Sequence, residues 1–111
     1  MKKMDELSLV VQMKLSAQRA LLGQVTPSLR SVSMCWDEAN TVIRVRYIFD
    51  GAPSDSVKDA ALCEGTQIIA DFPSPWTIDE EFVNTPYPEK MEHLDWLVFL
   101  RCEDAWVSSD A

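Results

Sequence analysis

The sequence predicts an α+β domain in which two helices cover a four-stranded antiparallel sheet, with the elements in the order α-β-β-α-β-β. Three observations support this prediction. Helical periodicity occurs near the N-terminus and again in the middle of the chain, two alternating runs flank a short polar turn, and two more strand-like runs follow the second helix. We expect residues 1–111, of which 47% are hydrophobic, to form one domain with its own core.

The first predicted helix runs from Met4 to Leu22. One polar stripe recurs at spacings of three and four, and the apolar residues opposite it are expected to pack on the sheet. The stripe comprises Asp5, Ser8, Gln12, Ser16 and Arg19, and the apolar side comprises Leu7, Val10, Val11, Leu15, Ala17, Leu21 and Leu22. Gly23 is expected to end the helix in a left-handed conformation, and Pro27 prevents its resumption.

The segments LRSVSMCW and TVIRVRYIF alternate in polarity and are joined by the polar turn DEAN, a pattern that predicts a β-hairpin. One face is apolar and should meet the helices, whereas the other carries serines and arginines and is expected to be at least partly wet. A second helix is predicted from about Ser54 to Phe72, capped by Ser54 or Asp55. Gly65 in its middle costs about 1 kcal/mol relative to alanine, so close packing is the expected reason for it.

The C-terminal third contains two further candidate strands. WTIDEEFV is compatible with a strand or a short helix, and as a strand it places Glu80 among apolar neighbours. NTPYPEKMEH is predicted to be a loop, because its two closely spaced prolines exclude a helix and a central strand. LDWLVFLRC is the most apolar stretch and is predicted to be a central strand.

The sequence lacks a recognisable catalytic, metal or cofactor set, and we expect none. The chain has three widely spaced cysteines, Cys35, Cys63 and Cys102. An odd number at such spacing is typical of reduced core thiols. His93 is the only histidine and is expected to be a surface loop residue. The three glycines are isolated, which excludes a phosphate-binding glycine loop. A small carboxylate-dependent hydrolase that uses Asp79 and Glu81 remains an alternative, although nothing else completes such a site.

Charge is distributed unevenly along the chain. Residues 1–50 carry seven Lys/Arg and five Asp/Glu, a net charge of +2, whereas residues 51–111 carry three and thirteen, a net charge of −10. An acidic surface repels nucleic acid and attracts basic proteins, so direct nucleic-acid binding is disfavoured. The acidity could also serve solubility alone. Neither a membrane-spanning run nor a signal-peptide core is present, so we expect a cytoplasmic protein.

The stretch from Pro75 to Trp96 combines carboxylates with aromatic residues and is the best candidate for a protein-binding surface. Trp36 and Trp96 lie within predicted strands and are expected in the core. Trp76 either anchors a partner or folds back over the sheet edge. The predicted binding residues are Trp76, Asp79, Glu80, Glu81, Tyr87, Glu89 and Glu92, with Asp55 and Asp59 in second rank.

Three segments, LLGQVTPSLRSVSM, YIFDGAPSDSVKDAALCEGTQIIADFP and PYPEKMEHLDWLVFLR, carry a family resemblance. Over about residues 20–101 the chain resembles small bacterial immunity proteins of contact-dependent growth inhibition and related polymorphic toxin systems. The matching residues are Leu22, Gly23, Thr26, Pro27, Leu29, Arg30, Asp50, Gly51, Ile68, Ile69, Ala70, Asp71, Phe72, Pro73 and Arg101. They resemble fold markers rather than binding residues. The segment AALCEGTQ departs from the family pattern, because it is more apolar than the usual glutamate-rich helix.

The resemblance implies a non-enzymatic immunity protein that binds and neutralises one cognate toxin domain. Many toxins of these systems are nucleases with basic clefts, which an acidic protein can occlude. The alternative is an acidic adaptor or regulatory module that binds another basic protein and has no toxin partner.

Overall fold

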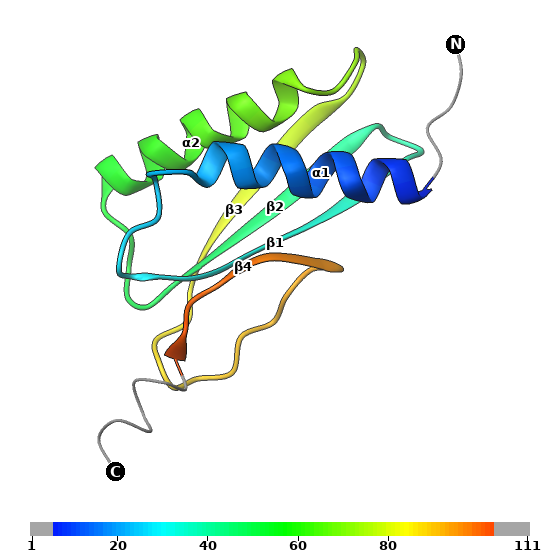
Figure 1. Ribbon diagram of the computed structural model, residues 1–111. Coiled ribbons are helices and arrows are strands. Elements are labelled where there is room, and N and C mark those ends of the chain that lie inside the picture. The colour runs from blue at the N-terminus through cyan, green and yellow to red at the C-terminus, as the bar shows by residue number, and fades with distance from the viewer. Residues whose placement is uncertain (1–5, 104–111) are drawn as a thin grey trace.

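The computed structural model describes residues 6–103 of the chain. The elements in this range are α1 (Glu6–Leu21), β1 (Leu29–Asp37), β2 (Val42–Phe49), α2 (Asp55–Ala70), β3 (Thr77–Asn84) and β4 (Trp96–Leu100). Both helices lie on the same side of a four-stranded sheet (Figure 1). We call this side of the sheet the helix face and the opposite side the open face. The predicted helix start at Met4, and Asp5 of the polar stripe, lie outside the described residues.

The sheet has the strand order β3-β2-β1-β4, and it is mixed rather than antiparallel. β1 runs antiparallel to β2 and to β4, whereas β2 and β3 are parallel. The prediction of a wholly antiparallel sheet was therefore wrong at one pair. The reason is that α2 crosses over the sheet between β2 and β3 and returns the chain to the end from which β2 starts, so β3 runs in the same direction as β2.

The prediction of a central strand near the C-terminus was also wrong, because β4 lies at an edge of the sheet. β3 and β4 occupy opposite edges, so residues 85–95 must cross the sheet to connect them. We call residues 85–95 the crossing loop. The central strands are β1 and β2, and the apolar run in β4 is only partly buried, with Leu97 and Leu100 exposed.

Helix α1 buries only part of the predicted apolar side, including Ala17 and Leu21. Its buried residues are Leu9, Met13, Ser16, Ala17, Ala20 and Leu21. Val11, Leu15 and Leu22 of the predicted apolar side are exposed. Ser16 is buried because its hydroxyl donates a hydrogen bond to the Asp71 carboxylate at 2.7 Å, which satisfies the polar group between the two helices. Gly23, with φ 76°, follows the helix in the predicted left-handed conformation.

Local signals in the second helix and in the hairpin are confirmed. The Ser54 hydroxyl accepts a hydrogen bond from the Val57 amide and caps α2. β1 and β2 form the predicted hairpin, in which Met34 pairs with Val45 and Val32 with Tyr47 on the helix face. These four side chains are almost completely buried and, together with the buried residues of α1 and α2, form the core.

The open face is drier than the alternating serines and arginines indicated. Ser31 and Ser33 are fully buried. The crossing loop covers them, since His93 Nε2 lies 3.0 Å from the Ser31 hydroxyl and the Leu94 amide donates to the Ser33 hydroxyl at 2.9 Å. Exposed His93 is therefore tied to the sheet. The cysteines are free, but Cys63 and Cys102 are exposed and Cys35 is half-buried, so the expectation of core thiols was wrong.

Candidate functional site

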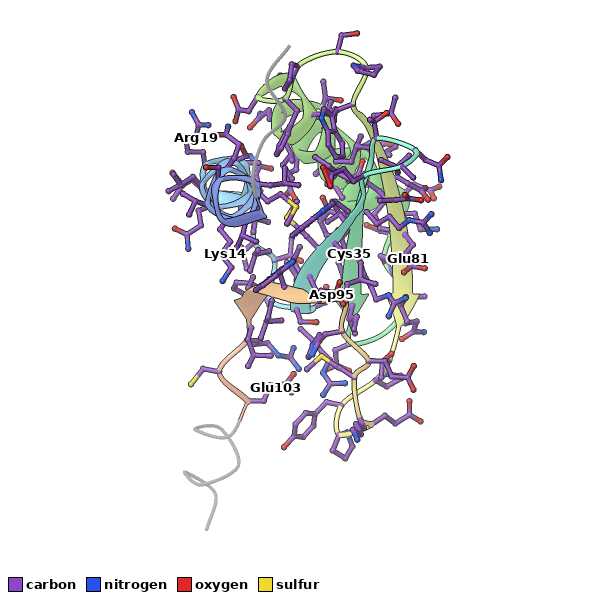
Figure 2. The ribbon with its side chains drawn as sticks, turned by 90° about the vertical axis from the view of Figure 1, so that its right-hand side faces the viewer. Lys14, Arg19, Cys35, Glu81, Asp95 and Glu103 are labelled. Atoms are coloured by element: carbon purple, nitrogen blue, oxygen red, sulfur yellow. The ribbon has the colours of Figure 1, made fainter. Side chains whose placement is uncertain are left out.

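The pleat of β3 separates its three consecutive carboxylates. Asp79 and Glu81 project from the open face and are exposed, opposite Arg44 and Arg46 of β2. Figure 2 shows the sheet from its side, with α1 on one side and Glu81 on the other. Glu80 projects to the helix face instead and is half-buried. The predicted binding residues of β3 therefore lie on two different faces of the sheet, because successive side chains of a strand point to opposite faces.

Glu80 belongs to the interior of the protein. Its carboxylate accepts a hydrogen bond from the Tyr47 hydroxyl at 2.8 Å and lies against Gly65 of α2. A Cβ atom at residue 65 would overlap this carboxylate, which explains the glycine in the middle of a helix. Burial raises the pKa of Glu80, and the bond from Tyr47 opposes this rise. Glu80 therefore shapes the contact between α2 and β3 and is not placed on a surface with Asp79 and Glu81.

On the open face, Arg46 joins β3 to the crossing loop. Its Nε donates to the Glu81 carboxylate, and its Nη1 donates to the Glu92 backbone carbonyl at 2.9 Å. Beside it lies a groove of about 300 Å³ with both apolar and charged lining residues. The groove is lined by Arg46, Ile48, Val83, Thr85, Lys90 and Glu92. This is a concave site at the junction of strand and loop, of the kind that accepts a partner's side chain.

The start of the crossing loop is held by a second arginine. Arg30 is 3% exposed and donates to the backbone carbonyls of Thr85 and Glu89, at 2.7 and 2.9 Å. Its guanidinium also makes two hydrogen bonds to the Glu103 carboxylate, at 2.7 and 2.9 Å. These bonds hold the pKa of Glu103 below its ordinary value. The arginine also lies over the ring of Tyr87, 40% of which remains exposed.

The structure places Asp79 and Glu81 on the open face, where Arg46 links Glu81 to Glu92. Tyr87 and Glu89 lie near the start of the crossing loop, beside Arg30. The structure does not place the other candidates at either position. Trp76 is half-buried and packs against Phe72 with ring centroids 6.2 Å apart, so the ring folds back onto the core. Asp55 and Asp59 are exposed, but they belong to α2 in the helix layer.

Several carboxylates near this site have no cation partner. Among residues 8–103, the acids Asp50, Asp71, Glu81 and Glu103 form ion pairs with arginines. Asp79, Glu89, Glu92 and Asp95 are exposed and form none within the same range. Sequence reasoning did not include Asp95 or the groove beside Arg46. The alternation in β2 placed Arg46 on the polar side, but its partners became visible only with the parallel pairing of β2 and β3.

Comparison with protein-family models decides between the two kinds of binding protein that the sequence left open. The model of the MafI2 immunity protein matches residues 10–103, which include all the elements from β1 to β4 and most of α1. The chain belongs to the MafI2 immunity protein family. A search of curated proteins gave no match.

Membership of the MafI2 family makes this chain an immunity protein, and its partner is a cognate toxin. The predicted resemblance to immunity proteins of polymorphic toxin systems is thereby confirmed. As a member of the MafI2 immunity family, the chain is expected to act by binding. No helix in the described part of the structure is long and apolar enough to cross a membrane.

Proposed function

We propose that this immunity protein neutralises its cognate toxin by binding it on the open face, and that the toxin is a nuclease whose basic surface is occluded. The observation that carries the proposal is the group of acids without cation partners around the crossing loop, beside the groove at Arg46. The proposed binding residues are Asp79, Glu81, Tyr87, Glu89 and Glu92, with Asp95 added from the structure.

The physical basis is electrostatic complementarity. Nucleases bind a polyanion, so their active-site surfaces are rich in Lys and Arg. A surface with an excess of exposed carboxylates attracts such a cleft and speeds association. Tyr87 adds a partly exposed aromatic ring, and the groove can receive a side chain of the partner. In this proposal the protein works in the cytoplasm, performs no catalysis and protects nucleic acid by excluding it from the toxin.

The first test is neutralisation. The protein encoded immediately upstream is the candidate toxin; it is expressed with and without this chain, and the purified protein is assayed on DNA and RNA. We expect co-expression to restore growth and the added protein to stop cleavage. A toxin that cleaves neither nucleic acid, or that stays active in the presence of the protein, would refute the nuclease proposal.

The second test locates the surface with matched charge changes. D79N/E92Q removes two carboxylates from the open face, and D55N/D59N removes two from the exposed side of α2. We expect the first pair to weaken toxin binding by about tenfold, mainly through a slower on-rate, and the second pair to have a smaller effect. Rising salt should reduce the difference. Equal losses for the two pairs would show that net charge acts without an open-face site.

A further inference from the structure

The outer edge of β3 is an unpaired strand edge. β3 lies at the end of the sheet and, among the residues that the structure describes, pairs only with β2. Its register with β2 is unbroken over eight residues, from Thr77 opposite Val42 to Asn84 opposite Phe49. Unpaired edges bind other strands readily, so they are usually short, bulged or covered. β3 contains neither a proline nor a bulge in its pairing.

The hydrogen bonds at the two ends of β3 show which backbone groups face outward. The Thr77 amide donates to the Thr41 carbonyl, and the Thr85 amide donates to the Phe49 carbonyl, both at 2.9 Å and both toward β2. Backbone groups of a strand alternate between its two edges, so all the odd-numbered residues between these ends bond to β2. The N–H and C=O groups of Ile78, Glu80 and Phe82 therefore point to the outer edge.

The opposite edge of the sheet is a poorer template for strand pairing. β4 has five residues against eight in β3, and a bulge interrupts its pairing with β1 between Val32 and Ser33. A bulge increases the local twist and reduces the length over which a further strand can pair. The longer and more regular free edge is that of β3, next to Asp79 and Glu81.

We infer that the toxin adds an extended segment to the outer edge of β3, which would then become an internal strand of a larger sheet. This inference rests on the proposed function and adds the mode of binding. Main-chain hydrogen bonds to Ile78, Glu80 and Phe82 would hold the segment. Specificity would come from Lys or Arg at alternate positions, beside Asp79 and Glu81 on the open face, with apolar residues beside Ile78 and Phe82 on the helix face.

The same carboxylates oppose pairing with a second copy of this chain. In a symmetric antiparallel pair centred on Glu80, Asp79 of each copy would face Glu81 of the other. Like charges directly opposite each other destabilise a strand pair, whereas a basic segment is attracted. The edge is therefore protected against self-association and remains open to a basic partner.

Residue-resolved amide exchange of the full chain, alone and bound to the toxin domain, tests the inference. In the free protein we expect rapid exchange for the amides of Ile78, Glu80 and Phe82 and slow exchange for those of Asp79 and Glu81. Toxin binding should slow exchange of the first three amides by at least about tenfold. A complex that leaves these amides unchanged, or that protects β4 instead, overturns the inference and leaves the proposed function standing. Absence of any complex overturns both.

A backbone substitution gives a second measurement. I78P removes one outward N–H without removing a bond to β2, and proline is tolerated at such edge positions. I78A is the matched control, because it shortens the same side chain but keeps the N–H. We expect I78P to bind toxin at least about tenfold more weakly than I78A. Equal binding by two folded variants overturns the inference.

Discussion

Glu64 carries a carboxyl group in the interior, and replacing it should change how stability depends on pH. The residue is 5% exposed, on the side of α2 that faces the sheet. It lines a small cavity that also reaches Tyr47, Gln24 and Thr26. Burial, and to a lesser extent the negative charge of Glu80, together raise the pKa of Glu64 from 4.5 to about 7.

The sign of this pH dependence follows from comparing the pKa of Glu64 in the folded and unfolded states. Because folding raises this pKa, the folded protein holds the proton more tightly than the unfolded chain does. The contribution of Glu64 to stability is fully present below about pH 4.5 and is lost as pH rises through about 7. The difference between these pKa values corresponds to a loss of about 3 kcal/mol in the free energy of unfolding between pH 4 and pH 8.

Other carboxylates act in the opposite direction at lower pH. Arg30 lowers the pKa of Glu103, and the Tyr87 amide, followed by Arg101, lowers that of Asp50. Stability from these groups is present above their unfolded pKa values of 4.5 and 3.8 and is lost as pH falls through the lower folded values. We therefore expect a stability maximum near pH 5, with the alkaline side of the curve set by Glu64 and Glu80.

The assay is urea denaturation at pH 5, 6, 7 and 8 for the wild type, E64Q and the control D59N. The E64Q variant keeps the size of the side chain but cannot ionise, so it should lose less stability between pH 5 and pH 8 and exceed the wild type at pH 8 by about 1–3 kcal/mol. Asp59 lies on the exposed side of the same helix, and D59N should follow the wild type. An E64Q curve parallel to that of the wild type would refute the reasoning.

Two further substitutions test the packing that positions the site. G65A should destabilise the protein by about 1–3 kcal/mol, despite the higher helix propensity of alanine, because the added Cβ displaces the Glu80 carboxylate from its bond with Tyr47. In an E80A background the same change should become neutral or stabilising, and urea denaturation of the four proteins measures this coupling. R30A should cost about 2–3 kcal/mol and speed amide exchange in the crossing loop, since the carbonyls of Thr85 and Glu89 lose their donor while Glu103 keeps its bonds to Arg101; an unchanged melting temperature would contradict this.

Features specified by nearby residues were predictable from the sequence. The Ser54 cap, the left-handed Gly23 and the hairpin around DEAN each depend on contacts within a few residues. The close packing inferred for Gly65 was also correct, because a glycine costs a helix stability unless space requires it.

The errors concern partners that are distant in the sequence. Apolar periodicity in α1 cannot show that Ser16 is buried, since its partner Asp71 follows 55 residues later. Strand direction depends on how α2 crosses the sheet, and an apolar run does not reveal that β4 is an edge strand. The binding residues were chosen by their proximity in sequence, whereas the pleat sends Glu80 inward and the ring of Trp76 folds back onto Phe72.

The anchoring of the crossing loop makes its path largely independent of its own side chains. Four side chains of the sheet and its ends hold the loop through main-chain atoms. Arg30 binds the carbonyls of residues 85 and 89, Arg46 binds that of residue 92, Asp50 accepts from the amide of residue 87, and Ser33 accepts from that of residue 94. Main-chain groups are the same for almost every residue type, so substitutions in the loop leave these anchors intact. Arg30 and Asp50 are among the residues that carry the family resemblance. The crossing loop is held at the carbonyls of Glu89 and Glu92, and the exposed side chains of these two residues face the partner in the proposed complex. The path of the crossing loop is thus compatible with different side chains along it.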